Sequence, residues 1–128
     1  MHARRTLLAL LAAGLPMAAL AHGEGARGAN GGLIGELGDR HIELLANDGE
    51  IRVWVLDPQD RPISAAGTTG NLIVLVQGRQ QTLRLEPAEG NAYLVARGDF
   101  RAAPGMRVVA SMTFPGLSPR QARFTPAG

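Results

Sequence analysis

The sequence contains no cysteine, no lysine and few aromatic side chains, which make up 4% of its 128 residues. Without cysteine the protein cannot use disulfides or a thiol nucleophile, so an apolar core must hold the fold together. Every basic residue other than histidine is an arginine. We interpret that preference as a compositional bias of the genome and assign it no function.

Net charge is also small once the start of the chain is set aside. Two of the arginines, Arg4 and Arg5, lie in a leader-like segment, whereas every acidic residue follows position 21. The remaining chain is therefore formally neutral, despite an overall charge of +2. A role in binding nucleic acid or an anionic membrane loses its main support.

The first 21 residues have the pattern of a secretory signal peptide. A basic start is followed by the apolar run 7–15, then by Pro16 and the small-residue site Ala19-Leu20-Ala21. The run is too short for a membrane span, so we expect cleavage after Ala21 and a periplasmic location. Adjacent arginines also suggest a twin-arginine signal, which we consider less well supported than a general secretory one.

A glycine-rich segment follows. Residues 22–38 contain seven glycines and no regular apolar pattern. We interpret this segment as a flexible arm that docks, if at all, near its end. The predicted organisation is a signal peptide over 1–21, an arm over 22–38 and one β-sandwich domain over 39–128.

Residues 41–57 predict a β-hairpin with Asp48-Gly49 at its tip, in a type I′ turn. The resulting register makes one apolar face from the pairs Ile42 with Val55, Leu44 with Val53 and Ala46 with Ile51. The opposite face receives His41 with Leu56, Glu43 with Trp54 and Leu45 with Arg52. His41, Glu43 and Trp54 are therefore expected to point away from the core.

Short strands with turn residues between them continue to the end of the chain. We expect them at 72–77, 82–85, 93–96, 107–114 and 120–125, and less clearly at 63–69. Gly78-Arg79 is predicted as a type II′ tip between the first two of these. No window after the leader shows a helical period. The sequence therefore predicts an all-β fold of six to seven antiparallel strands, either a single immunoglobulin-like β-sandwich or a small Greek-key barrel.

Histidine is the residue that could carry metal chemistry. If the signal is cleaved after Ala21, His22 becomes the N-terminal residue, and its α-amine and imidazole can chelate one ion. His41 would add a third nitrogen, a set suited to Cu(II), with Zn(II) or Ni(II) as alternatives. Glu24 and Glu43, or Glu36, could add an oxygen. The competing interpretation is a solvated His41 and an N-terminal histidine that binds nothing.

Other candidates point to packing or to a partner. Met112 shares a predicted face with Val108 and Phe114, so we expect it in the core rather than as a thioether ligand. Trp54 on the outer face is a candidate interaction anchor. Together with Leu45, Leu56, Ile73 and Leu75 it would form a docking face in a metal-free interaction module.

The sequence contains no recognisable catalytic motif. The serines lack a nucleophile-elbow context, and no phosphate-binding loop is present. We therefore expect a protein that is not an enzyme.

Several segments resemble a group of small exported β-sandwich proteins that accompany bacterial heavy-metal efflux systems. Similar segments occur in the periplasmic adaptor subunits of such pumps. The segments are His22-Gly23, His41-x-Glu43-Leu44, Asp48-Gly49, Val55-Leu56-Asp57, Arg61-Pro62, Ala66-Gly67, Leu85-x-Pro87-Ala88 and Gly90-Asn91. His22 also resembles the mature N-terminal histidine of periplasmic copper-resistance sandwiches.

This resemblance implies a periplasmic protein that handles copper or another divalent metal, with His22 and His41 at matching positions. We expect a metal buffer or an accessory to an efflux component. The alternative is the metal-free module that docks on an envelope or efflux partner.

Overall fold

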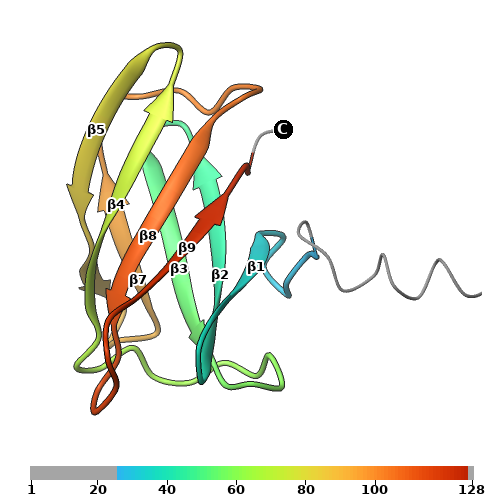
Figure 1. Cartoon of the computed structure of the whole chain (residues 1–128), viewed down its shortest axis with the longest axis vertical. Coiled ribbons are helices and arrows are strands. Elements are labelled where there is room, and N and C mark those ends of the chain that lie inside the picture. Colours follow the sequence, from blue (N-terminus) through green and yellow to red (C-terminus); the bar gives the residue numbers. More distant parts are fainter. Residues whose placement is uncertain (1–25, 127–128) are drawn as a thin grey trace, which may run out of the picture.

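The computed structural model describes residues 26–126 and contains two antiparallel β-sheets packed face to face (Figure 1). The predicted signal peptide and residues 22–25 of the predicted arm lie outside the described residues. Nine strands follow one another: β1 (Leu33–Leu37), β2 (Arg40–Asn47), β3 (Glu50–Leu56), β4 (Thr69–Val76), β5 (Arg79–Arg84), β6 (Glu86–Ala88), β7 (Tyr93–Arg97), β8 (Arg107–Thr113) and β9 (Arg120–Phe124). No described segment forms a helix with the length and apolarity needed to cross a membrane.

Strand order distinguishes between the two architectures that the sequence leaves open. The five-stranded sheet has the order β1-β2-β3-β7-β6 and the four-stranded sheet the order β5-β4-β8-β9. Without β1, these are the orders of the two sheets of an immunoglobulin domain, with strands A-B-E-D in one and C′-C-F-G in the other. Among the described residues no hydrogen-bonded strand pairing joins the sheets, so the fold is a sandwich and not a closed barrel.

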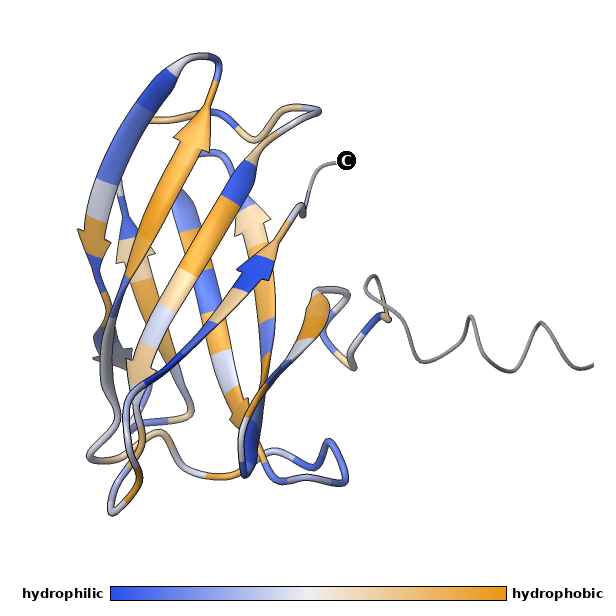
Figure 2. Cartoon of the chain, viewed as in Figure 1, coloured by the Kyte–Doolittle hydropathy of each residue, from blue (hydrophilic) through white to orange (hydrophobic). Residues whose placement is uncertain are grey.

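The interior between the sheets is mainly aliphatic. Alternation of apolar and polar residues along the strands places one face of each sheet inward. Figure 2 shows β4 as a largely hydrophobic strand beside the largely hydrophilic edge strand β5. The predicted core residues Val108, Ala110, Met112 and Phe114 are each buried. Met112 is therefore a packing residue, as expected.

The predicted register of the first hairpin is confirmed, with all six predicted pairs present between β2 and β3. Its turn differs from the predicted type I′ geometry, because of the two tip residues only Gly49 has a positive φ, 73°. Gly49 donates its N–H to the carbonyl of Phe100 at 2.8 Å, and Asp48 accepts from the N–H of Ala102 at 2.8 Å. These long-range hydrogen bonds, absent from local sequence patterns, hold the turn.

The tip of the second hairpin is Gln77-Gly78 and not the predicted Gly78-Arg79. Both tip residues have positive φ, 51° and 76°, as a type I′ turn requires. Ile73 therefore pairs with Thr82 instead of Arg84. The shift is two residues, so every side chain keeps its predicted face.

Residues 33–37, which we assigned to the flexible arm, form β1 at the edge of the five-stranded sheet. The ordered sandwich therefore begins before the predicted boundary at residue 39. Leu33, Gly35 and Leu37 alternate on the inward side, and Gly38-Asp39 is the two-residue tip that leads into β2. A Cβ on Gly35 would lie 2.5 Å from Cζ of Phe124 in β9, so only glycine allows this close approach between the sheets.

Candidate functional site

The outer face of the five-stranded sheet carries the candidate residues in two rows. Cross-strand partners share a face in an antiparallel sheet. Glu36, His41 and Leu56 form one row across β1, β2 and β3, and Glu43 and Trp54 belong to the next row. The register therefore confirms that His41, Glu43 and Trp54 point away from the core.

His41 is held by a carboxylate. Its Nδ1 lies 2.6 Å from Oδ1 of Asp60, and the His41 side chain is 16% exposed. An ionised carboxylate can only accept a hydrogen bond, so Nδ1 carries the proton in the neutral ring. Nε2 then keeps its lone pair and is the nitrogen able to bind a metal.

The turn before Asp60 is built by Asp57. One oxygen of Asp57 accepts hydrogen bonds from the N–H groups of Gln59 and Arg61, and the other accepts from the Arg61 guanidinium at 2.9 Å. The pKa of Asp57 is lowered by these bonds, above all by the Arg61 N–H. Asp60 itself has a φ of 64°, a left-handed conformation that this turn imposes. Asp57 thereby fixes the position from which Asp60 reaches His41.

Glu43 does not have the free, solvent-facing carboxylate that we predicted as a metal ligand. The residues before β1 fold over it and leave it 1% exposed. Its carboxylate accepts from the N–H groups of Asn30 and Gly32, both at 2.8 Å, and from the Asn30 amide at 3.0 Å. A buried carboxylate requires such donors, and these bonds occupy both its oxygens.

The segment over Glu43 fits because of its glycines. A Cβ on Gly28 would lie 2.4 Å from Cδ of Glu43, and one on Gly32 would lie 2.5 Å from the carbonyl oxygen of Leu44. Ala26 and Arg27 continue as a short antiparallel bridge along β1. The end of the arm is therefore docked on the sheet, and Glu43 is its anchor. Sequence reasoning missed this role, although the turn-forming Asn30-Gly31-Gly32 offered a signal.

The two remaining predicted ligands, His22 and Glu24, lie outside the described residues. Between residues 26 and 126, no group of three or more histidine and acidic side chains is placed to hold a metal ion. The described part of the chain thus contributes one prepared nitrogen, on His41, but no complete site.

Trp54 is half-buried and packs on Tyr93, with ring centroids 5.5 Å apart. The Arg52 guanidinium lies 5.0 Å from the centroid of the Tyr93 ring. The docking face predicted around Trp54 does not exist as one surface. Leu45 and Leu56 share the outer face of Trp54, whereas Ile73 and Leu75 lie on β4, in the opposite sheet.

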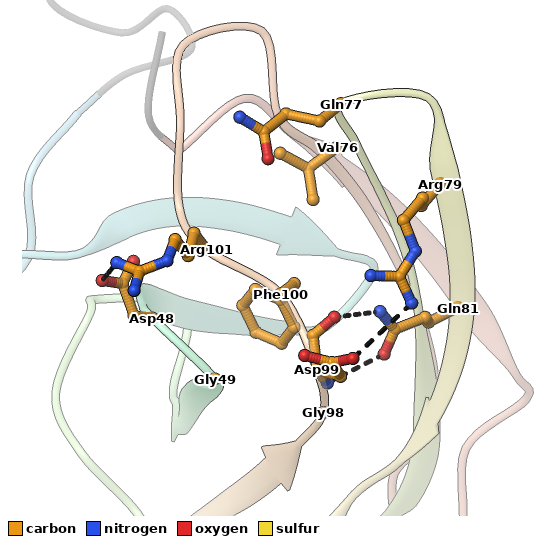
Figure 3. Close-up of a pocket in the computed structure, with 10 residues that line it drawn as sticks. All are labelled: Asp48, Gly49, Val76, Gln77, Arg79, Gln81, Gly98, Asp99, Phe100 and Arg101. Atoms are coloured by element: carbon orange, nitrogen blue, oxygen red, sulfur yellow. Dashed lines mark hydrogen bonds and ion pairs between the residues drawn. The ribbon is translucent and has the colours of Figure 1, made fainter.

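A hollow of about 520 Å³ lies at the end of the sandwich near the Asp48-Gly49 turn (Figure 3). Its charged groups are paired, Arg79 with Asp99 at 3.7 Å and Arg101 with Asp48 at 3.6 Å. Gln81 also forms two hydrogen bonds with the backbone of Asp99. The polar lining is therefore engaged in holding the loop 98–101 in place, and nothing in it indicates reactive chemistry.

Comparisons with protein-family models, with curated proteins and with solved structures found no match to this chain. Its function must therefore be argued from the arrangement of its own residues.

Proposed function

We propose that this chain is an exported, non-enzymatic protein that binds a transition metal between His22 and His41. In this proposal it acts in the periplasm as a metal buffer or as an accessory to heavy-metal efflux. The observation that carries the proposal is the 2.6 Å contact between Nδ1 of His41 and Asp60.

Metal-binding histidines commonly donate their second ring N–H to a carboxylate, which fixes the ring and makes the ligating nitrogen more basic. Asp60 stands in this relation to His41. The imidazole is also partly shielded, so its orientation is set before any ion arrives. A solvated histidine on a sheet surface would need neither feature.

The docked arm supports the participation of His22. The carbonyl of Ala26 accepts a hydrogen bond from the N–H of Ile34 in β1. Ile34 is two residues from Glu36, the residue of β1 that pairs with His41. Two strand spacings and two residues of strand separate Ala26 from His41, or about 12 Å. His22 precedes Ala26 by four residues, which can span about 14 Å. The distance therefore permits His22 to reach His41.

Three nitrogens would then surround the ion: the α-amine and imidazole of His22 and Nε2 of His41. Such a set suits Cu(II), with Zn(II) and Ni(II) as weaker alternatives. Glu24 is available for an added oxygen in this proposal, whereas Glu43 is excluded because the arm occupies its carboxylate.

The test is a titration of signal-cleaved protein with Cu(II), followed by electron paramagnetic resonance and calorimetry. The comparison proteins carry one extra alanine before His22, or the substitution His41→Ala. We expect nitrogen coordination that both changes weaken. Equal binding by all three proteins, or no binding by the cleaved protein, would contradict the proposal.

The alternative function, a metal-free interaction module, predicts a different result for Trp54. Trp54 is half-buried and packs on the buried ring of Tyr93, so Trp54 is the aromatic residue of this pair that a partner could contact. In that case Trp54→Ala should weaken binding to a purified efflux adaptor subunit, and His41→Ala should not. Adaptor binding that is unchanged in Trp54→Ala but weakened in His41→Ala would favour the metal-binding function.

A further inference from the structure

Charge is divided unequally between the two sheets. The four-stranded sheet contains no acidic residue in any of its strands, but five arginines: Arg79, Arg84, Arg107, Arg120 and Arg123. The strands of the five-stranded sheet carry both signs of charge. Although the chain after position 21 is formally neutral, the strands of the four-stranded sheet therefore carry a net positive charge.

Three of these arginines belong to the outer face of the four-stranded sheet. Arg84 pairs with Asn71, Arg107 with Leu75 and Arg123 with Val109, all on the side opposite the core. All three arginines are exposed. The ion pairs among residues 26–126 include none of the three, so no carboxylate in that part of the chain pairs with them.

The centre of the same face is apolar. Leu75 is 36% exposed and is the only large hydrophobic residue classed as exposed in the described part of the chain. Ile73 and Val109, which pair across β4 and β8, are half-buried beside it. An apolar centre with arginines around it is typical of protein–protein interfaces, in which arginine is enriched and lysine is depleted.

We propose that the outer face of β5-β4-β8-β9 docks an acidic protein segment that also carries apolar side chains. Four strands of this length cover about 450 Å² in projection. Standard interfaces bury roughly 800 Å² of accessible surface per partner, and a face of this extent offers a small contact area, so we expect a weak and transient complex. The unpaired arginines would accelerate association and favour acidic partners.

An anionic membrane fits the same face less well. Polybasic membrane-binding segments contain roughly four to eight Lys or Arg residues and often insert aromatic side chains. This face has three arginines, and the outward positions of β4, β5, β8 and β9 contain no aromatic residue. A protein partner is therefore the occupant that we propose.

The test uses two synthetic acidic peptides of equal length and charge, identical except that leucines in one are glycines in the other. Binding to isotope-labelled protein is followed through backbone amide shifts. We expect shifts on the four-stranded sheet, preference for the leucine peptide, and binding about tenfold weaker in R84Q/R107Q/R123Q. Raising NaCl from about 0.05 M to about 0.3 M should weaken binding in the same direction.

Two control variants separate the charge and apolar contributions. R40Q/R97Q/R101Q removes the same charge elsewhere and should leave peptide affinity nearly unchanged, and Leu75→Gln should abolish the preference for leucine. Equal losses in both triple variants would overturn the proposal. Binding to phosphatidylglycerol vesicles but to neither peptide would also overturn it, in favour of a membrane. Since no metal is present in these experiments, their outcome is independent of the proposed metal site.

Discussion

Nδ1 of His41 lies 2.6 Å from Oδ1 of Asp60, although the rest of β2, the hairpin turn and all of β3 lie between them in the sequence. The pairing connects the outer face of β2 to a loop whose shape is set by Asp57. It leaves Nε2 of His41 as the nitrogen available to an ion.

In the proposed metal site, replacing Asp60 with asparagine should lower Cu(II) affinity by about tenfold, because His41 would lose its anionic partner. Asparagine tolerates the positive φ of Asp60, so the turn should persist. Competition titration with a chelator of known affinity measures the change. Asp99→Asn, a change of the same charge at an exposed loop position, is the control. Affinities that match in all three proteins would show that Asp60 does not support a ligand.

Replacing Glu43 with glutamine should release the arm. The amide keeps one acceptor but loses the charge that receives two backbone N–H groups, at a cost of about 2 kcal/mol in the free energy of unfolding. Urea unfolding gives that cost, and hydrogen exchange at Asn30 and Gly32 should accelerate. Glu36→Gln, an exposed change on β1, should affect neither measurement. Slow exchange retained in Glu43→Gln would rule out the anchoring role.

Replacing Gly35 with alanine should destabilise the fold by about 1–3 kcal/mol, because the new methyl group would overlap the Phe124 ring. Thermal unfolding provides the measurement. Phe124→Leu removes the end of the ring and should lessen the cost of Gly35→Ala in a double-mutant cycle. Additive effects of the two changes would mean that the contact between β1 and β9 is not the cause.

Acid should loosen the turn that holds Asp60. Hydrogen bonds, chiefly from the Arg61 N–H, lower the pKa of Asp57 in the folded protein. The stabilisation is therefore complete above the unfolded value of about 3.9 and is lost as pH falls through the folded pKa. Amide exchange at Gln59 and Arg61 should thus stay slow from neutral pH to about pH 4 and accelerate below it, relative to the intrinsic rates. In Asp57→Asn that acid-induced change should disappear. Loosening already near neutral pH would contradict this assignment.

Much of the sandwich follows from local patterns. The alternation in residues 41–57 and 107–114 correctly predicts which side chains point into the space between the sheets, because a strand turns successive side chains to opposite faces whatever lies around it. The predicted tip of the second hairpin was wrong by one position, but each side chain of β4 and β5 still lies on the predicted face. β1 was missed because Gly35 interrupts its apolar pattern, and the close approach of Phe124 from the other sheet, which leaves no room for a Cβ there, is visible only in the folded protein.

The candidate site was less predictable. The register placed His41 and Glu43 on the same outer face. It could not indicate that Asp60 would bind His41 or that the arm would cover Glu43. Both outcomes depend on where distant segments cross the sheet. The predicted docking face failed for a similar reason, since Trp54 and Leu75 belong to strands of different sheets.

Local patterns in the sequence were sufficient to predict the class of fold, the core residues of the two hairpins and of β8, and the outward direction of His41, Glu43 and Trp54, because side-chain alternation and turn chemistry act over a few residues. The environment of those outward side chains depends on tertiary structure. It buried Glu43 as an anchor, oriented His41 through Asp60 and gathered unpaired arginines on one sheet, because contacts of this kind depend on strand order and on segments that meet only after folding.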